Sequence, residues 1–353
     1  MSLKRTTGIW LGGGLKKGIS KFSHSYQDII SLENLFGAWK EFLNGKRGRA
    51  DVCEFALHLS DNIFDLHSEL KAKMYRHGQY HHFVVSDPKR RDIHKATVRD
   101  RVLHRAIYRK LYPYFDRKFI SDSFSCRNYK GTHRAINCFR DFDRKESRNH
   151  TRTCWILKCD IKRFFASIDQ DILVDILRKH IGGESILNLL KEIIFSFKPN
   201  GLPLGNLTSQ LFANIYLNEF DQFVKHKLRV KHYVRHADDF VILLDDKNYL
   251  ENRMPVIKDF LQYKLKLILH PDKIFIKTLC SGIDFLGWVN FKNFRVLRTK
   301  TKRKMFKKIR ENPAKEIINS YLGLLSHGNS KKLGGKIDSC LTAHTLIEPL
   351  DFV

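Results

Sequence analysis

The sequence lacks long apolar runs, and it contains far fewer acidic than basic residues. No run approaches the roughly 18 consecutive apolar residues that cross a bilayer. The start of the chain contains lysines but not the apolar segment of a secretory signal. These absences exclude a typical transmembrane protein and predict a protein that stays in the cytoplasm.

The cysteines lack the spacing of a metal site or of a redox pair. The chain has seven cysteines, and none of them forms a Cys-x-x-Cys pair or a Cys/His ligand set. A structural zinc is therefore not expected. In a chain of 353 residues, scattered cysteines predict reduced thiols that are mostly buried.

The excess of positive charge indicates a polyanionic partner. Lys and Arg total 64 against 37 Asp and Glu, so the formal net charge is +27. Such a field attracts nucleic acids or anionic membrane surfaces. No basic amphipathic helix of the kind that lies on membranes stands alone in the sequence, so nucleic acid is the favoured partner.

Neither internal repeats nor a long Pro/Ser linker divides the chain, which reads as one assembly of four regions. Residues 1–88 form a mainly helical extension, in which apolar residues at three- and four-residue spacing predict a helix over 51–70. Residues 89–155 interleave basic and aromatic residues. Residues 156–290 alternate strand-like and helical patterns, typical of an α+β core. Residues 291–353 open with a basic run without an acid, which predicts a helix surface facing phosphates.

Two patterns place carboxylates at strand ends. A short apolar strand ends in Asp160. Further along, the strand-like runs 232–235 and 240–244 flank a tight turn with Asp238 and Asp239, a pattern typical of a β-hairpin. Adjacent acids in a turn are usually structural, because Asp suits turn geometry.

The setting of these acids favours a metal site. A sheet that buried the hairpin would hold the carboxylates close together, where their repulsion is costly unless a divalent cation neutralises it. Asp160, Asp238 and Asp239 would then hold two Mg²⁺ ions about 3.5–4 Å apart, the arrangement that stabilises the attacking and leaving oxygens in phosphoryl transfer. Oxygen ligands favour Mg²⁺, or Mn²⁺, over zinc.

A Gly/Pro turn lies between the two patterns and leads into an apolar helix. It runs from Gly201 to Gln210. One interpretation is a plain helix start, with Asn206 or Thr208 as the N-cap. The order along the chain favours another interpretation, because an Asp-ending strand, a Gly/Pro turn with a helix, and an Asp-Asp hairpin follow one another as motifs A, B and C of polymerase palms.

On these motifs the sequence resembles a reverse transcriptase from about Arg91 to Arg298. It is most similar to the reverse transcriptases of diversity-generating retroelements, because Leu202–Gln210 has an aliphatic residue and a terminal Gln where most relatives have Gln-Gly-x-x-x-Ser-Pro. The resemblance implies an α+β right-hand polymerase. The second, third and fourth regions would be the fingers, a palm of antiparallel sheet backed by helices, and a short helical thumb.

The resemblance also implies an RNA-directed DNA polymerase that copies template RNA into cDNA from dNTPs. Asp160, Asp238 and Asp239 match the three catalytic aspartates, and the backbone carbonyl of Ile161 would complete the metal site. Lys273 matches a basic residue that protonates or stabilises the pyrophosphate leaving group. A solvated lysine is the alternative.

Other matches concern the incoming nucleotide. Phe165 matches the aromatic steric gate that selects deoxynucleotides, and the alternative is that Phe164 and Phe165 are core residues. The other residues that the resemblance places at the nucleotide are Arg91 and Arg101, which match finger arginines that hold the triphosphate, and Leu204, Gly205 and Gln210.

Further matches concern the primer and the template. The segment Gly282–Trp288 resembles the primer-grip hairpin, and the basic segment after it resembles a thumb that follows the duplex backbone. The predicted nucleic-acid contacts are Phe285, Leu286 and Gly287 of the hairpin, Lys89 of the fingers, and Lys302, Arg303 and Lys304 of the thumb.

Two residues depart from the usual family pattern. His236 occupies the position usually held by Tyr in Tyr-x-Asp-Asp, beside the primer end, which predicts altered efficiency or fidelity and not loss of the reaction. Leu204 replaces an amide that contacts the nucleotide in many relatives. In the diversity-generating group this aliphatic position is associated with misincorporation opposite template adenine, so the resemblance implies mutagenic copying.

The same resemblance implies a partner, a small basic helical accessory variability protein that assembles as a ring. One alternative is a retron, group II intron or phage-defence reverse transcriptase. Another is a non-catalytic RNA-binding scaffold, which loss of a catalytic Asp would support, but all three are present. A nuclease or integrase would need a carboxylate set of its own, and the sequence offers none.

Overall fold

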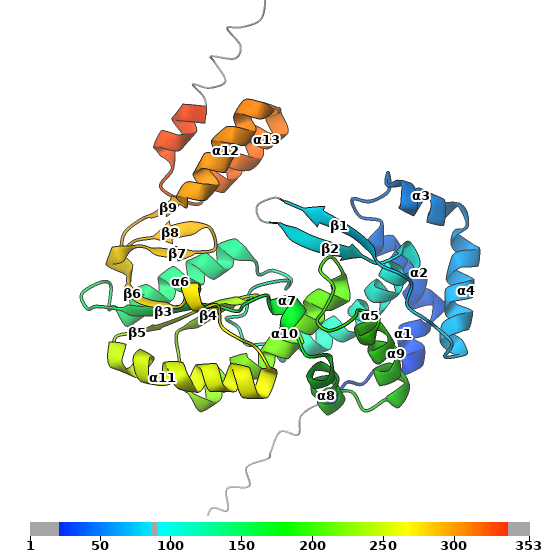
Figure 1. Ribbon diagram of the computed structural model, residues 1–353. Helices are drawn as coiled ribbons and strands as arrows, with labels where there is room; N and C mark the ends of the chain where they lie inside the picture. The colour runs from blue at the N-terminus through cyan, green and yellow to red at the C-terminus, as the bar shows by residue number, and fades with distance from the viewer. Residues whose placement is uncertain (1–20, 87–89, 338–353) are drawn as a thin grey trace, which may run out of the picture.

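The structure, a computed structural model, describes residues 21–86 and 90–337 (Figure 1). Its first part is helical. Ser25 and Ser31 cap α1 and α2, because their hydroxyl oxygens accept backbone N–H groups of the first turn. These helices pack around α5, and their apolar side chains join one large hydrophobic core. The bounds are α1 Tyr26–Ile30, α2 Leu32–Phe42, α3 Ala50–Leu57, α4 Leu59–Lys71 and α5 Val98–Asp116.

The helix predicted over 51–70 is two helices. The chain turns at His58, where φ is −118° and ψ is 38°, so α3 and α4 point in different directions. Leu66 and Leu70 are buried as the spacing predicts, whereas Ala56 is exposed. The periodicity of apolar residues continues across the break and therefore conceals it.

A two-stranded hairpin follows the N-terminal helices. Strands β1 (His81–Val85) and β2 (Arg91–Lys95) pair antiparallel, with Val85 opposite Arg91. A boundary at residue 88 would divide this hairpin. The strand β1 therefore belongs with the residues that follow it.

The central sheet has four antiparallel strands in the order β4-β5-β3-β6 (Figure 1). This confirms the predicted α+β class, with an antiparallel sheet backed by helices. The strands are β3 Trp155–Asp160, β4 Tyr233–His236, β5 Asp239–Leu244 and β6 Phe275–Thr278.

The two faces of this sheet pack against different helices. Leu157 and Phe240 point into the large core that includes α10 and α11, while Ile156 and Val241 point into a second core with α6. This alternation is the period of two expected for strands buried on both faces. The helices are α6 Thr132–Glu146, α7 Phe164–Ser167, α8 Gln170–His180, α9 Glu184–Phe195, α10 Leu207–Gln222 and α11 Lys247–Asp259, with π-helical ends at Phe223–Lys227 and Phe260–Lys264 and 3-10 turns at Pro271–Lys273 and Leu279–Ser281.

The C-terminal region shares the second core. Trp288 is buried, and a Cβ added at Gly328 would lie 2.1 Å from its indole ring, so the chain after α13 packs directly on this residue. Arg295 links β9 to α6, because its guanidinium donates to Asn137 Oδ1 at 3.1 Å. The elements are β7 Ile283–Phe285, β8 Trp288–Asn290, β9 Arg295–Leu297, α12 Thr299–Glu311 and α13 Lys315–Leu325, followed by a helical segment over 331–337.

The prediction that the cysteines are mostly buried is wrong for those that the structure describes. Cys154 and Cys159 are buried in the sheet, whereas Cys53, Cys126 and Cys280 are exposed. Cys126 and Cys280 lie outside the strands and Cys53 lies on an exposed side of α3, so none of the three is placed by the strand pattern. Cys340 lies outside the described residues. Within 21–86 and 90–337, no helix is both long and apolar enough to cross a membrane.

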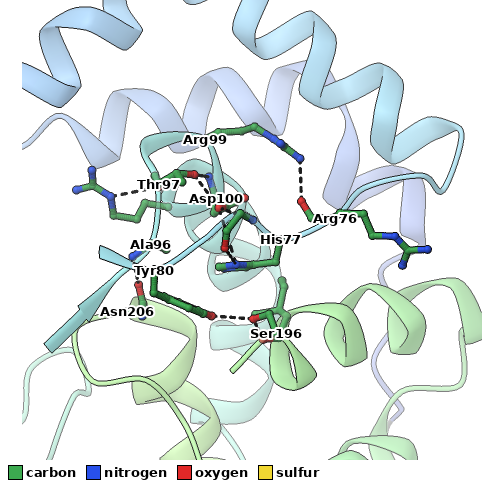
Figure 2. A network of polar contacts seen from close by, with 12 residues as sticks. Arg76, His77, Tyr80, Ala96, Thr97, Arg99, Asp100, Ser196 and Asn206 are labelled. Atoms are coloured by element: carbon green, nitrogen blue, oxygen red, sulfur yellow. Dashed lines mark hydrogen bonds and ion pairs between the residues drawn. The ribbon is translucent and has the colours of Figure 1, made fainter. Parts of the chain in front are cut away.

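A buried polar network attaches the segment before β1 to the start of α5 (Figure 2). Its centre is Asp100, which is fully buried and whose carboxylate accepts hydrogen bonds from Tyr75 Oη (2.8 Å), Thr97 Oγ1 (2.7 Å) and the Gly78 backbone N–H (3.1 Å). Tyr80 Oη bonds Ser196 Oγ at 2.8 Å, which ties the same segment to the end of α9. The network therefore fixes where the β1–β2 hairpin begins.

His104 lies beside this network in the core. Its side chain is buried, neither ring nitrogen has a hydrogen-bond partner, and its ring lies 5.3 Å from that of His77. Burial, with a smaller effect of His77, lowers the pKa of His104 from 6.5 to about 3. The folded protein therefore holds this ring neutral.

Replacing His104 should flatten the pH dependence of stability. Below about pH 6.5 the unfolded chain binds a proton on this ring, while the folded chain does not until about pH 3, so folding becomes less favourable as the pH falls. We expect His104→Phe to lose less free energy of unfolding between pH 6.5 and 4 than the wild type. Urea unfolding at several pH values measures this difference, and parallel curves for the two proteins would contradict it.

Candidate active site

Strand pairing brings the three predicted catalytic aspartates together. Asp160 ends β3 and lies directly opposite Asp239, the first residue of β5, so both side chains project from the same face. His236 pairs with Asp239 and closes a two-residue turn at Ala237 and Asp238. The Ile161 N–H donates to the Asp238 carbonyl at 3.2 Å, which joins this turn to the end of β3.

The three carboxylates influence one another electrostatically. Burial raises the pKa of Asp239 to about 7, an effect that Lys158 opposes and that the charges of Asp160 and Asp238 reinforce. Asp239 Oδ1 is buried and has no hydrogen-bond partner. A positive charge beside this oxygen would lower the cost of ionising the group.

Two lysines supply positive charge at the site. Lys158, on β3, lies 3.2 Å from Asp239 Oδ2, and Lys273 donates to Asp160 Oδ1 at 2.8 Å. Lys273 reaches Asp160 because the His270 N–H bonds the Asp160 carbonyl at 2.8 Å and holds the loop against β3. The structure therefore places the predicted Lys273 at the aspartates.

The oxygen atoms at the sheet end are of the chemical kind that suits a hard divalent cation. The three carboxylates and the Ile161 carbonyl are oxygen ligands of the kind that Mg²⁺ prefers, and the unpartnered Asp239 Oδ1 is an available ligand atom. In the described ranges, no group of three or more His, Cys, Asp or Glu side chains is arranged to hold a metal ion. Asp160 and Asp239 instead contact Lys273 and Lys158, and a metal ion would compete with these contacts.

The Gly/Pro turn before α10 is bonded to the β1–β2 hairpin. The His94 N–H donates to the Leu204 carbonyl at 2.9 Å. The Asn206 side chain accepts from the Ala96 N–H at 3.2 Å and donates to the His94 carbonyl at 2.8 Å. Gly205 has φ +109°, and a Cβ there would lie 2.8 Å from the side chain of Ile93, so this close approach requires glycine.

The interpretation of this turn as a plainly capped helix start is therefore wrong. Asn206 occupies the N-cap position of α10, but its side chain makes no capping hydrogen bond. Thr208 lies inside the helix and is buried. Leu204 is half-buried, and Gly205 and Gln210 are exposed.

The same turn contacts the segment that carries Phe165. The Leu202 N–H bonds the Phe165 carbonyl at 2.8 Å, and a Cβ at Gly201 would lie 2.7 Å from that carbonyl oxygen. Phe164 is buried in the large core, while Phe165 is only partly buried. Of the two rings, Phe164 is the core residue, and Phe165 is the one that remains accessible.

The structure does not bring Arg101 to the aspartates. Its guanidinium bonds Asp51 on α3 at 2.5 Å and lies over the ring of Phe42 on α2, 5.0 Å from the centroid. Arg91 is exposed at the start of β2. Lys89 lies outside the described residues.

His236 lies between the turn and α6. It is half-buried, and its Nε2 lies 3.3 Å from Thr132 Oγ1 at the first turn of α6. Burial lowers the pKa of this ring below its ordinary value. An uncharged ring therefore adjoins the turn at neutral pH.

The predicted primer-grip segment is a hairpin, but one of its residues is a core residue. Leu286 and Gly287 form the turn between β7 and β8, with φ of +52° and +88°. Phe285 is fully buried and packs against Phe139 of α6, with ring centroids 5.5 Å apart. The Phe285 side chain therefore belongs to the core, whereas Leu286 and Gly287 lie at the tip of the hairpin.

The basic residues Lys302, Arg303 and Lys304 lie in the first turns of α12. Arg303 is exposed, and Met305 on the same helix is buried in the second core. The helix thus separates an apolar side from a basic one, and the basic run predicted from the sequence is helical.

Three residues near the Ala237–Asp238 turn were not predicted from the sequence. They are Lys158, Arg235 and Asp221. Lys158 had a signal, since it lies two residues before Asp160 in a strand and therefore shares its face. Arg235 and Asp221 had only the weak signal of charged residues within apolar patterns.

Comparison with known proteins decides the family. Residues 86–290 match the family model described as reverse transcriptase (RNA-dependent DNA polymerase), which is more than half of the chain. The chain belongs to the reverse transcriptase family. The matched residues contain the central sheet, the turn before α10 and all three aspartates.

The curated relatives and the solved structures share little sequence identity with this chain. Protein YkfC of Escherichia coli is 26% identical over 243 residues, covering 57% of this chain and 63% of that protein. The group II intron-encoded protein LtrA of Lactococcus lactis is 22% identical over 287 residues, covering 60% and 46%. A structure of telomerase from Candida albicans has a TM-score of 0.47 at 12% identity, covering 70% and 52%. The chain spans less than two thirds of each of these proteins.

Removing the Asn206 side chain should destabilise the protein. Asn206→Ala removes the partner of the buried Ala96 N–H, and an unsatisfied buried group costs about 1–3 kcal/mol; it also removes a partner of the half-buried His94 carbonyl. We expect the free energy of unfolding, measured by urea titration, to fall by about 1–3 kcal/mol. Asn188→Ala on α9 is a matched control, because Asn188 is exposed, and we expect a change within about 0.5 kcal/mol. Equal effects of the two variants would contradict the assigned role.

Proposed function

We propose that the protein is an RNA-directed DNA polymerase that joins a dNTP to a primer 3′-hydroxyl. The observation that carries the proposal is the register of β3 and β5, which sets Asp160 opposite Asp239 beside the turn with Asp238. Membership of the reverse transcriptase family supports it.

The proposed chemistry assigns a role to each group at the sheet end. Asp160, Asp238, Asp239 and the Ile161 carbonyl would hold two Mg²⁺ ions, with Mn²⁺ as a substitute. When bound, the ions lower the pKa of the attacking hydroxyl and neutralise charge on the phosphates. Lys273, already at Asp160, would supply positive charge or a proton to the leaving pyrophosphate.

Other residues would select and orient the nucleotide. Phe165, the accessible ring of its pair, would exclude a ribose 2′-hydroxyl. Leu204, Gly205 and Gln210 would line the nucleotide site. Arg91, exposed on β2, would bind the triphosphate. Arg101 could do so only if its guanidinium left Asp51.

Template RNA and cDNA are the proposed macromolecular ligands. The net charge of +27 supports a polyanionic ligand. The turn at Leu286 and Gly287 would contact the primer, and the basic side of α12, with Lys302, Arg303 and Lys304, would follow the duplex backbone. The extension, fingers, palm and thumb are proposed as the functional regions, with β1 assigned to the fingers because it pairs with β2.

Substituting an aspartate at the turn should abolish synthesis. We expect Asp238→Asn to lower DNA synthesis on an RNA template by about a thousandfold or more, since metal ions supply several kcal/mol of transition-state stabilisation and each 1.4 kcal/mol is tenfold. Incorporation of labelled dNTP on a primed RNA with Mg²⁺ measures this.

Asp245→Asn is the matched control for this experiment. Asp245 follows the opposite end of β5 and is exposed, so we expect wild-type yield. Equal yields from Asp238→Asn and the wild type would refute the proposed activity.

We propose further that copying is error-prone at template adenines, as in a diversity-generating retroelement. The aliphatic Leu204 in the turn before α10 and Gln210 in the first turn of that helix support this proposal. A small basic accessory variability protein in a ring would then be a partner. Similarity to the group II intron-encoded protein LtrA favours the alternative, an intron-type reverse transcriptase.

The error spectrum separates these two alternatives. We expect the wild type to misincorporate several-fold more often opposite template adenine than opposite the other three bases, and we expect Leu204→Gln to reduce this excess by restoring an amide at the nucleotide. Sequencing of cDNA made from one defined RNA by both proteins measures it, and the other three bases serve as internal controls. A uniform error rate in the wild type would favour the intron-type alternative.

A further inference from the structure

A buried arginine lies directly behind the turn that carries Asp238. Arg235 is on β4, and its side chain has no appreciable exposure to solvent. It forms a two-point ion pair with Asp221 at the end of α10, with Nε 2.7 Å from Oδ1 and a terminal nitrogen 2.6 Å from Oδ2. Tyr233 Oη also donates to Asp221, at 2.8 Å. Planar guanidinium and carboxylate groups that pair in this way have a fixed relative orientation.

The terminal nitrogens of the Arg235 guanidinium also bond a backbone carbonyl and two polar side chains. One terminal nitrogen donates to the carbonyl of Ala237 at 3.2 Å and lies 3.3 Å from Asn214 Oδ1, and the other donates to Ser123 Oγ at 3.0 Å. The Ala237 carbonyl belongs to the peptide that enters Asp238. Arg235 therefore connects α10 to the turn itself.

The peptide on the other side of Asp238 is also held. Its carbonyl, that of Asp238, accepts from the Ile161 N–H at 3.2 Å. Both peptide planes that flank Asp238 are thus fixed, one by a side chain and one by the end of β3. Fixing both planes defines the direction in which the Asp238 carboxylate projects.

The turn needs such support because it contains an unfavourable conformation. Ala237 has φ +55°, a region that residues with a Cβ seldom occupy. Conformations of this kind persist only where surrounding contacts determine them. The Arg235 contact with the Ala237 carbonyl is one of those contacts.

We propose that Arg235, held by Asp221, is a positioning residue that sets the Ala237–Asp238 turn in the conformation that binds divalent cations. This inference rests on the proposed function of the three aspartates. It assigns to the ion pair a role in metal affinity that is separable from its role in stability. Residues that orient metal ligands typically change metal affinity by about 10–100-fold when they are replaced.

Replacing the pair by apolar residues separates the two roles. Removing only one partner would leave an uncompensated buried charge, whereas apolar pairs of similar volume often preserve stability. We expect the double variant Arg235→Met/Asp221→Leu to remain folded, with a melting temperature lowered by the loss of the buried Tyr233 Oη partner. It loses the bond to the Ala237 carbonyl, so we expect its Mn²⁺ dissociation constant, measured by electron paramagnetic resonance titration, to rise about 10–100-fold.

A second variant keeps the test decisive if the double variant does not fold. Arg235→Lys retains the charge opposite Asp221, but an ammonium lacks the planar fork that reaches both the carboxylate and the Ala237 carbonyl. We expect the same loss of Mn²⁺ affinity at a temperature well below melting. Ser123→Ala is the matched control, because it removes a bond to the same guanidinium without touching the turn, and we expect wild-type Mn²⁺ affinity.

The outcomes distinguish this inference from the proposed function. Wild-type Mn²⁺ affinity in a folded Arg235 variant would overturn the inference, and the ion pair would be structural only. A wild-type protein that neither binds Mn²⁺ nor synthesises DNA would overturn the proposed function instead. An active wild type with weakened Mn²⁺ binding in the variants and unchanged binding in Ser123→Ala supports both.

Discussion

Repulsion among three carboxylates at one end of a buried sheet is the constraint on which the rest of the site depends. Strand pairing forces Asp160 and Asp239 to project side by side, and the turn adds Asp238. Such an arrangement costs free energy unless positive charge is nearby. Lys158 and Lys273 supply that charge from two different elements, so the sheet end can hold its acids together, and the proposed metal ions would replace these lysine contacts.

Backbone carbonyls and N–H groups around the site are held by side chains from distant parts of the chain. Arg235 bonds the turn, Asn206 bonds β2, and Asp100 bonds the segment that leads into β1. Each of these polar groups is buried and paired, which makes it costly to remove and specific in geometry. The β1–β2 hairpin, the turn before α10 and the aspartate turn are therefore fixed relative to one another by hydrogen bonds and not by apolar packing alone.

The sequence predicts the fold class from local patterns, and it predicts the convergence of the aspartates from the order of the motifs along the chain. Short apolar runs mark β3 and β5, and the tight Asp-Asp turn sets the register of β4 with β5. Contacts between side chains far apart in sequence leave no such pattern. The partner of Arg101 is Asp51, the Asn206 side chain bonds β2 and not its own helix, and Phe285 faces the core. Each depends on tertiary packing that spacing does not encode.

The packing of Trp288 against Gly328 has a consequence for how a long ligand would move. The helices that follow β9 share a hydrophobic core with one face of the sheet, so they cannot swing outward like an arm without exposing that core to water. A nucleic-acid duplex that lay on the basic side of α12 would contact a surface whose shape does not change. Advance by one nucleotide would then be a screw motion of the ligand past a stationary surface, with the protein serving as a guide for the strand.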